Sequence, residues 1–294
     1  MSVNGFCKTN LSEYLKELGK EYRKLNGKSI PAEITLVGGA AVLANYGFRE
    51  MTYDIDALIH SSSAMKQAAN NVGNRLNLPN NWLNADFTKT DSYSQKLWEV
   101  SVYYKTYSNI LTVRTVSAEF LLAMKLMSGR AYKHDTSDIT GILLEHQKAG
   151  EPISRERIER AIVRLYGENA VLPDSSAKLL DDAYSNNNLE ALYRRCLERE
   201  EKTRALLSKY SQDHPDAIRA ENIKDVINLL EEMEQQTISE SKTKPDLTEG
   251  LNELITSAVK EKIANNNKFK NSSHSLSVNY DANKQHTGDK EFGN

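Results

Sequence analysis

The segment from Leu36 to Ile59 constrains the fold of this chain more than any other. Its pattern predicts a strand, a Gly–Gly turn, a short helix and a second strand, over Ile34–Val37, Gly38–Gly39, Ala40–Tyr46 and Asp54–Ile59. Short apolar runs that end in glycine are typical of buried strands followed by tight turns. Side chains alternate between the two faces of a strand, so Asp54 and Asp56 are expected on one face. The segment therefore predicts a compact α/β unit that presents two carboxylates together.

Two neighbouring carboxylates and a glycine turn suit a particular kind of ligand. Like charges side by side repel each other unless a cation lies between them. Mg²⁺ usually takes one or two carboxylates together with substrate phosphates. Glycines at the start of a helix let the backbone approach a phosphate and present N–H groups to it. We therefore expect Asp54 and Asp56 to bind Mg²⁺ (or Mn²⁺), and Gly38 and Gly39 to contact phosphate oxygens.

Three simpler readings of this segment compete with the metal–phosphate hypothesis. In the first reading, the two glycines form a turn and have no role in ligand binding. In the second, Asp54 and Asp56 are solvated charges on an edge strand, as an isolated Asp-x-Asp often is. A dinucleotide-binding fold is disfavoured, because the G-x-G-x-x-G spacing is missing and the helix is short for a βαβ crossover. The apolar residues that alternate with the acids, Ile55, Ala57 and Ile59, favour a central strand instead.

Outside this segment, the expected secondary structure changes at residue 117, from a mixture of helices and strands to helices alone. Before residue 117 we expect helices over 10–26 and 63–76 and paired strands over Leu97–Tyr104 and Ile110–Val116. After it, the periodicity predicts only helices, over Glu119–Met127, Asp138–Lys148, Arg155–Tyr166, Ser175–Tyr184, Leu189–Tyr210, Ala220–Gln235 and Leu247–Ala264. The expected fold is an α/β (α+β) domain with a small mixed sheet over 1–150, an all-helical domain over 151–264 and a disordered tail over 265–294.

Composition excludes several classes of protein. Lys and Arg number 38 and Asp and Glu number 40, so the formal net charge of −2 fits neither a basic nucleic-acid coat protein nor an acidic disordered chain. Two cysteines cannot build a disulfide scaffold or a four-cysteine zinc site. No apolar run approaches the length of a membrane span, and the N-terminus lacks the apolar core of a signal peptide. We expect a soluble cytoplasmic protein without a membrane partner.

Two strings of this sequence resemble a known superfamily. The string VGGAAVLANYGFREMTYDIDAL combines Gly–Gly, a short helix and Asp-x-Asp, and SAEFLLAMKLMSGRAYKHDTSDITGIL adds a helix with Met–Lys, then an Arg and an Asp. Both are similar to the nucleotidyltransferases that share the fold of DNA polymerase beta. The local match is to bacterial minimal nucleotidyltransferases related to the AbiEii toxins of abortive-infection and toxin–antitoxin systems. The resemblance covers the first half of the chain.

The resemblance implies a reaction and roles for particular residues. A nucleotide would move from an NTP to a hydroxyl of RNA, with tRNA favoured, or of a protein. Asp54 and Asp56 would bind the metal, while Gly38 and Gly39 would hold the β and γ phosphates. Cations that neutralise the triphosphate would come from Lys125, Arg130 and Arg49. The protein would be the toxin of a toxin–antitoxin or phage-defence pair, with a cognate antitoxin as a possible partner.

The chain departs from the superfamily pattern at two positions. A third carboxylate usually acts as general base, and here Asp86, after a Trp–Leu–Asn string, is favoured over Glu99 as the third catalytic acid. The usual Gly–Ser is Gly–Gly, which removes a hydroxyl that would contact phosphate. Two alternative functions therefore stay open. One is a binding or regulatory protein that keeps the fold without catalysis, and the other is a transferase acting on a small molecule such as an antibiotic.

Several charged residues near these motifs have simpler interpretations. Lys125 can also be a lone lysine that reaches water from an apolar helix, and Arg130 and Lys133 can be ordinary surface bases. Asp135 and Asp138 stand where a helix starts, and we expect them to cap it. The basic stretch from Arg194 to Arg204 is interleaved with Glu198, Glu200 and Glu201. This pattern favours a solvated helix face over an RNA-binding surface.

Overall fold

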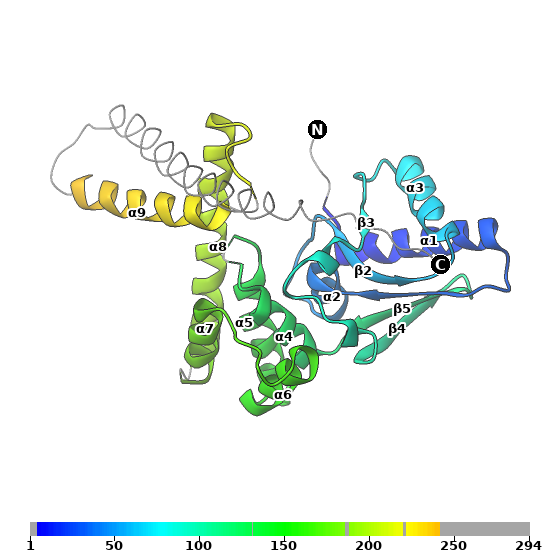
Figure 1. Cartoon of the computed structure of the whole chain (residues 1–294), viewed down its shortest axis with the longest axis horizontal. Coiled ribbons are helices and arrows are strands. Elements are labelled where there is room, and N and C mark those ends of the chain that lie inside the picture. The colour runs from blue at the N-terminus through cyan, green and yellow to red at the C-terminus, as the bar shows by residue number, and fades with distance from the viewer. Residues whose placement is uncertain (1–4, 131, 186–187, 220–221, 242–294) are drawn as a thin grey trace, which may run out of the picture. The chain divides into compact units, whose positions relative to one another are not determined.

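The computed structural model describes residues 5–130, 132–185, 188–219 and 222–241 of the 294-residue chain (Figure 1). The chain divides into two compact units, Met1–Arg204 and Ala205–Asn294. The boundary expected at residue 150 lies inside the first unit, because the helices on either side of it pack on one another. The helix expected over Leu247–Ala264 and the tail over 265–294 lie outside the described residues.

A five-stranded mixed sheet forms the centre of the first unit (Figure 1). Its strands lie in the order β3-β2-β1-β5-β4, with bounds Ala32–Leu36 for β1, Ile55–His60 for β2, Leu83–Asn84 for β3, Ser101–Tyr107 for β4 and Leu111–Val116 for β5. Strand β1 pairs with β2 antiparallel and with β5 parallel, and β2 pairs with β3 parallel. The α/β domain with a small mixed sheet, followed by helices alone, is thus confirmed.

The helices of the first unit fall into two groups. Those before the last strand are α1 (Lys8–Asn26), α2 (Gly38–Asn45), α3 (Ala64–Leu76) and the 3₁₀ turns η1 (Asp86–Lys89) and η2 (Gln95–Leu97). Those after it are α4 (Ala118–Ser128), α5 (Asp135–Lys148), α6 (Arg155–Tyr166), α7 (Asp174–Ser185) and α8 (Leu189–Asp213), of which α8 continues into the second unit. In the second unit, α9 covers Ile223–Ser241.

Apolar periodicity explains how the helices pack around the sheet. Helix α1 buries Leu11, Leu15, Leu18 and Tyr22 along one stripe, and it packs beside α3. Helix α2 is apolar on all sides and its residues 40–44 are buried, since it contacts the sheet, α1 and α4. Helix α4 in turn contacts α5, α6 and α7. The short helix α2 is therefore fixed from several sides, and its first residues cannot move independently of β2.

The structure corrects several expected boundaries. Strand β4 begins at Ser101, because residues 95–97 form the turn η2 where a strand was expected from Leu97. Helix α5 begins at Asp135 instead of Asp138. The two-residue strand β3 and the turn η1 were not expected, since neither is long enough to leave a periodic pattern. Within the described residues, no helix has the length and apolar content needed to cross a membrane.

Candidate active site

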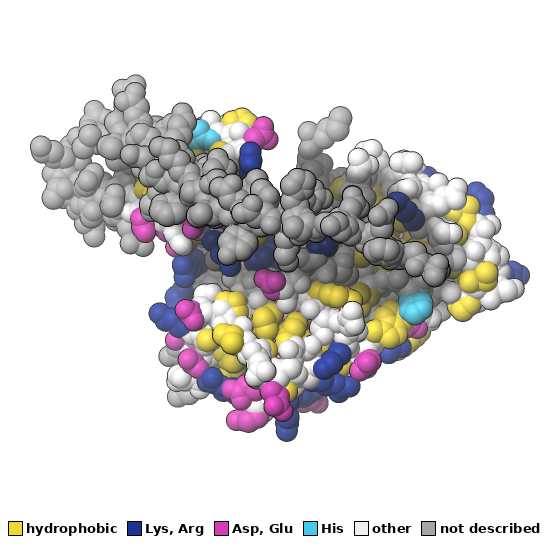
Figure 2. Space-filling model, in the orientation of Figure 1, with side chains coloured by type: hydrophobic (Ala, Val, Ile, Leu, Met, Phe, Trp, Pro, Cys, Tyr) yellow, Lys and Arg dark blue, Asp and Glu magenta, His cyan; other side chains and the backbone are white. Residues whose placement is uncertain are grey.

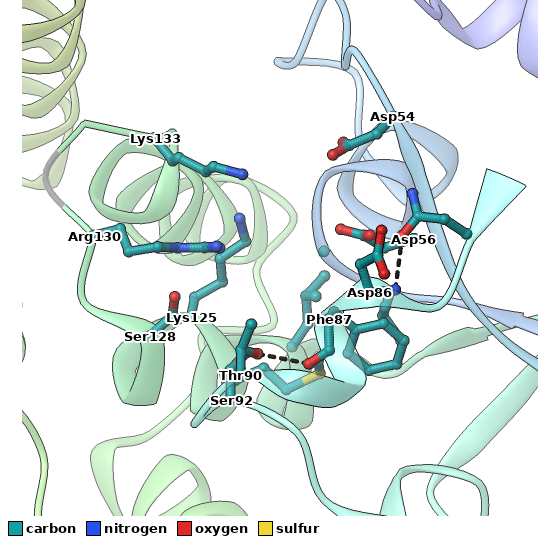
Figure 3. A pocket seen from close by; sticks show the side chains of 15 residues that line it. Asp54, Asp56, Asp86, Phe87, Thr90, Ser92, Lys125, Ser128, Arg130 and Lys133 are labelled. Atoms are coloured by element: carbon teal, nitrogen blue, oxygen red, sulfur yellow. Dashed lines mark hydrogen bonds between the residues drawn. The ribbon is translucent and has the colours of Figure 1, made fainter. Parts of the chain in front are cut away.

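A cavity of about 190 Å³ in the first unit brings the two sequence motifs together. On one side lie Asp54, Asp56 and Asp86, here called the acidic wall (Figure 3). Opposite them lie Lys125, Arg130 and Lys133, here called the cationic wall (Figure 3). The floor between the walls carries hydroxyl and apolar groups, from Phe87, Thr90, Ser92, Leu121, Met124 and Ser128. A ligand with both a cation and an anionic part matches this division of charge.

Strand β2 sets the positions of the two central carboxylates. Ile55 and Ala57 are fully buried in the core, whereas Asp56 points to the cavity and Asp54 stands just before the strand. The hydroxyl of Thr52 donates to Asp54 Oδ1 at 3.5 Å. Burial, together with the nearby charge of Asp54, raises the pKa of Asp56 to about 6. The charged form of Asp56 is thus unfavourable without a ligand.

The two glycines form the first turn of α2, beside the acidic wall. Gly38 has a φ of +55°, and a Cβ at this position would lie 3.4 Å from Asp56 Oδ2. Gly38 lines the cavity, whereas Gly39 does not. The space next to Gly39 is filled by Thr52 Oγ1 and the guanidinium of Arg49, which would lie 2.6 and 2.9 Å from an added Cβ. A side chain at position 39 is therefore excluded by packing.

Replacing Gly39 with alanine is expected to lower the free energy of unfolding by about 1–3 kcal/mol, as overpacking does in well-packed sites. Thr52 is buried and cannot move aside, and Arg49 is bound to Asp138. Urea unfolding measures the change. Gly47→Ala is the matched control, because nothing lies within 4 Å of its added Cβ. Equal stability of the two variants would contradict the packing described here.

The short strand β3 places Asp86 beside Asp54 and Asp56 in the acidic wall. Pairing between β3 and β2 sets Asn84 opposite Asp56, so the chain that follows β3 passes the same cavity. The side chain of Asp86 is 65% exposed and its Oδ1 lies 2.8 Å from Lys89 Nζ. Glu99, the other candidate for the third acid, is exposed and does not line the cavity. The geometry therefore favours Asp86 over Glu99.

Two cations of the opposite wall, Lys125 and Arg130, are held by two buried carboxylates. Lys125 is only 5% exposed, and its Nζ lies 2.8 Å from both Asp135 Oδ1 and Asp138 Oδ2. Arg130 Nε donates to Asp135 Oδ2 at 2.9 Å. Burial disfavours the charged form of Lys125, yet the two carboxylates outweigh it and raise the pKa of this lysine. Lys125 is thus a buried, fixed cation, and the interpretation of a lone lysine reaching for water is wrong.

Asp135 and Asp138 do not cap α5, contrary to expectation. Neither side chain accepts a capping hydrogen bond, and the residue at the cap position is His134. Both carboxylates turn instead toward cations from outside α5, because a buried acid is stable only when it is paired. Arg49 is one of these cations: it binds Asp138 and the backbone oxygen of Met51, and it does not line the cavity.

Several other residues line the cavity, and of these only Lys133 was considered from the sequence, either as a surface base or as a cation that faces Asp54 and Asp56. Lys133 lines it and forms no ion pair among the residues that the structure describes, so its charge is available to a ligand. Asn84, Thr90, Ser92 and Ser128 also line it. The hydroxyl of Thr90 donates to Phe87 O at 2.7 Å and lies 2.8 Å from that of Ser92. Polar residues of this kind carry no spacing signal, and only the fold brings them together.

The acidic wall meets the requirements of a Mg²⁺ ion that is shared with phosphates. Two carboxylates on one side of a cavity are a sufficient protein contribution for Mg²⁺ when phosphates complete its coordination. Within the described part of the chain, no three His, Cys, Asp or Glu side chains lie close enough together to hold a metal by themselves. The donor set therefore fits a metal that arrives with a phosphate ligand better than a metal held by protein alone.

Comparison with known proteins relates the segment that carries the cavity to a family of nucleotidyltransferases. Residues 13–151 match the model of a family described as "Nucleotidyltransferase of unknown function (DUF6036)". The matched segment contains both walls of the cavity, and it supports the nucleotidyltransferase superfamily for this part of the chain. The description gives no substrate and does not mention the AbiEii-related branch. No curated protein and no solved structure matches the chain.

Proposed function

We propose, from the nucleotidyltransferase family match of residues 13–151, that the protein is a Mg²⁺-dependent nucleotidyltransferase that moves a nucleotide from an NTP to a hydroxyl group. One observation carries the proposal: a pair of adjacent carboxylates faces a set of cations across one cavity (Figure 3). A metal–triphosphate is positive where its metal lies and negative along its phosphates. It complements both walls at once, which neither a free metal nor a free phosphate does.

The residues of the cavity divide the proposed reaction between them. Asp54 and Asp56 would hold Mg²⁺, which would stabilise the attacking and leaving oxygens of the displacement. The α2 N-terminus at Gly38 and the cationic wall bind the phosphates and stabilise the charge that builds up on pyrophosphate. The acceptor oxygen forms a bond to the α-phosphorus as the bond to the pyrophosphate oxygen breaks. Asp86 accepts the proton of the acceptor hydroxyl.

The volume of the cavity bears on which part of the ligand it encloses. Sites that enclose a whole small ligand usually measure about 300–1,000 Å³. At about 190 Å³, this cavity encloses only part of a nucleotide. The phosphates belong between the two walls, where the charge is, and the uncharged nucleoside belongs toward the hydroxyl and apolar floor. The acceptor then approaches from the open side, past Asp86, whose side chain is 65% exposed.

The acceptor and the biological role are proposed from the resemblance described above. Resemblance to AbiEii-related toxins favours an RNA, above all tRNA, or a protein, and a role as the toxin of a toxin–antitoxin or phage-defence pair in the cytoplasm. On the face seen in Figure 2, acidic and basic side chains are interspersed over the helices of the first unit. The described residues that are visible on this face form no continuous basic field, which favours recognition of an RNA acceptor near the cavity and its free cation Lys133.

Label transfer tests the proposed reaction directly. The protein is incubated with Mg²⁺, each α-labelled NTP in turn, and either total tRNA or cell protein. We expect label on one acceptor class from one or a few nucleotides, with pyrophosphate released in equal amount. EDTA should abolish the transfer. Lack of transfer to any acceptor, together with lack of Mg–NTP binding by calorimetry, would contradict the proposal.

A second candidate function is a binding or regulatory protein that keeps the cavity but lacks turnover. The observation that favours it is the pairing of Asp86 with Lys89, which occupies the proposed general base. The same calorimetry separates the two functions. Mg–NTP binding without pyrophosphate release in the presence of every acceptor supports the second function, whereas release supports the first.

A further inference from the structure

A buried carboxylate on α8 holds the beginning of α5. Glu200 is 1% exposed. Its Oε1 accepts hydrogen bonds from the backbone N–H groups of Thr136 and Ser137, at 2.8 and 3.0 Å. The hydroxyl groups of the same two residues also donate to this carboxylate. The interpretation of Glu200 as part of a solvated helix face is therefore wrong: it satisfies backbone donors at a helix N-terminus, where the helix dipole favours a negative charge.

The first turn of α5, which binds Glu200, also binds two cations of the cationic wall, Lys125 and Arg130. Residues 135 to 138 bind two different kinds of partner. Thr136 and Ser137 bind Glu200, whereas Asp135 and Asp138 bind cations. Asp135 contacts Lys125 and Arg130, both of which line the cavity. The backbone N–H of Arg130 also donates to Asp135 Oδ2, at 3.3 Å. The positions of these cations therefore depend on where the first turn of α5 lies.

We propose that Glu200 is a positioning residue for phosphate binding: by fixing the first turn of α5, it sets Lys125 and Arg130 at the cationic wall. The inference rests on the proposed function for the identity of the ligand, a triphosphate. Glu200 does not line the cavity and so acts only through the first turn of α5, by way of Asp135 and Asp138. The acidic wall lies on β2 and beside β3, so it keeps its geometry when Glu200 is changed.

Loss of the carboxylate has a definite physical effect. A buried N–H group without a partner is unfavourable, so the first turn of α5 is expected to shift or fray until water reaches it. Asp135 moves with that turn, and its contacts with Lys125 and Arg130 loosen. Glutamine at position 200 avoids most of this, because its amide oxygen still accepts the two backbone N–H groups and its amide nitrogen donates to the hydroxyl of Ser137.

Binding of inorganic tripolyphosphate, measured by calorimetry on the full chain, tests the proposal without relying on turnover. We expect Glu200→Ala to weaken this binding by about tenfold or more, which corresponds to about 1.4 kcal/mol. Glu200→Gln should stay close to wild type. Glu198→Ala, an exposed acid on the same helix, is the matched control and should have no effect. Mn²⁺ binding in the presence of saturating tripolyphosphate should be preserved in all variants.

Hydrogen exchange measured without ligand provides a second readout. Glu200→Ala should increase exchange in peptides that cover 132–138 and leave those that cover β2 unchanged. If this variant does not fold, Thr136→Ala/Ser137→Ala replaces it, since the double variant removes two donors to Glu200 and leaves the backbone donors in place. We expect from it a smaller loss of tripolyphosphate affinity in the same direction.

The outcomes separate this inference from the proposed function. Unchanged tripolyphosphate affinity in a folded Glu200→Ala protein would overturn the inference, as would an equal loss in Glu198→Ala. Unchanged exchange over 132–138 would also overturn it. A wild-type protein that binds neither tripolyphosphate nor NTP would contradict the proposed function. In that case the exchange experiment still decides whether Glu200 fixes the first turn of α5.

Discussion

Asp56→Asn is expected to reduce nucleotide transfer by about a thousandfold or more, because a metal ion contributes several kcal/mol to transition-state stabilisation. Asp56 points into the cavity and is one of the two carboxylates proposed to bind the metal. An amide is nearly the same size but neutral, so it keeps the packing and loses most of the affinity for Mg²⁺. The fall should appear in kcat at saturating Mg²⁺ and NTP. Asp91→Asn, an exposed acid outside the cavity lining, should leave the rate unchanged.

The same substitution should make the ligand-free protein more stable. Burial and the charge of Asp54 raise the pKa of Asp56 to about 6, so its charged form opposes folding. Above this pH, Asp56→Asn should unfold at a higher urea concentration than wild type. The gain should shrink as the pH falls through 6 toward the ordinary pKa of aspartate, because wild-type Asp56 becomes protonated in the folded state. A variant that loses both activity and stability would indicate misfolding instead of loss of a ligand.

Asp135→Asn is expected to lower the free energy of unfolding by about 3–5 kcal/mol, the usual cost of breaking a buried ion pair. Asp135 is fully buried, and the substitution leaves Lys125 and Arg130 without their shared carboxylate. Urea unfolding at pH 7 measures the change. Asp181→Asn breaks an ion pair with Arg155 in which the two side chains are 60% and 41% exposed, and it should change the stability far less than Asp135→Asn.

The pH dependence of this difference has a defined sign. Burial raises the pKa of Asp135, but Lys125 and Arg130 outweigh it and hold this pKa far below its ordinary value. A lowered pKa contributes stability that is fully present above the pKa of the unfolded chain, about 4 for aspartate. Wild type should therefore exceed Asp135→Asn by a constant amount from neutral pH to about 5, and by less as the pH falls further. A difference that is independent of pH down to strong acid would contradict this account.

The sequence was sufficient for the local part of the site. Asp54, Asp56 and Gly38 lie within one strand–helix–strand segment, so strand alternation and the glycine turn predict their proximity without tertiary information. The helices were also predictable where one apolar stripe runs along several turns, as in α1 and α6. A short strand such as β3 leaves no pattern, and for this reason Asp86 was assigned by resemblance instead of by structure.

The long-range part of the site could not be derived in the same way. Whether Asp135 caps a helix or pairs with Lys125 depends on burial, and burial is decided by helices that pack from elsewhere in the chain. The burial of Glu200 could not be predicted from the sequence either. This residue stands in a charged run whose average composition predicts a solvated face, and only the fold shows that one of these acids is enclosed. The periodicity of apolar residues cannot identify a single buried acid within a charged helix.

The arrangement of the two walls has a consequence for how the protein folds during synthesis. The acidic wall depends chiefly on the β1–β2 pair, whose strands are neighbours in the chain. The cationic wall requires α4, the first turn of α5 and finally Glu200 on α8, all made later. Contacts between segments close in sequence form early, and contacts that close long loops form late. A nascent chain that ends after β5 therefore carries its acidic residues without their counter-charges, and the proposed triphosphate binding would reach its full strength only when α8 has been added.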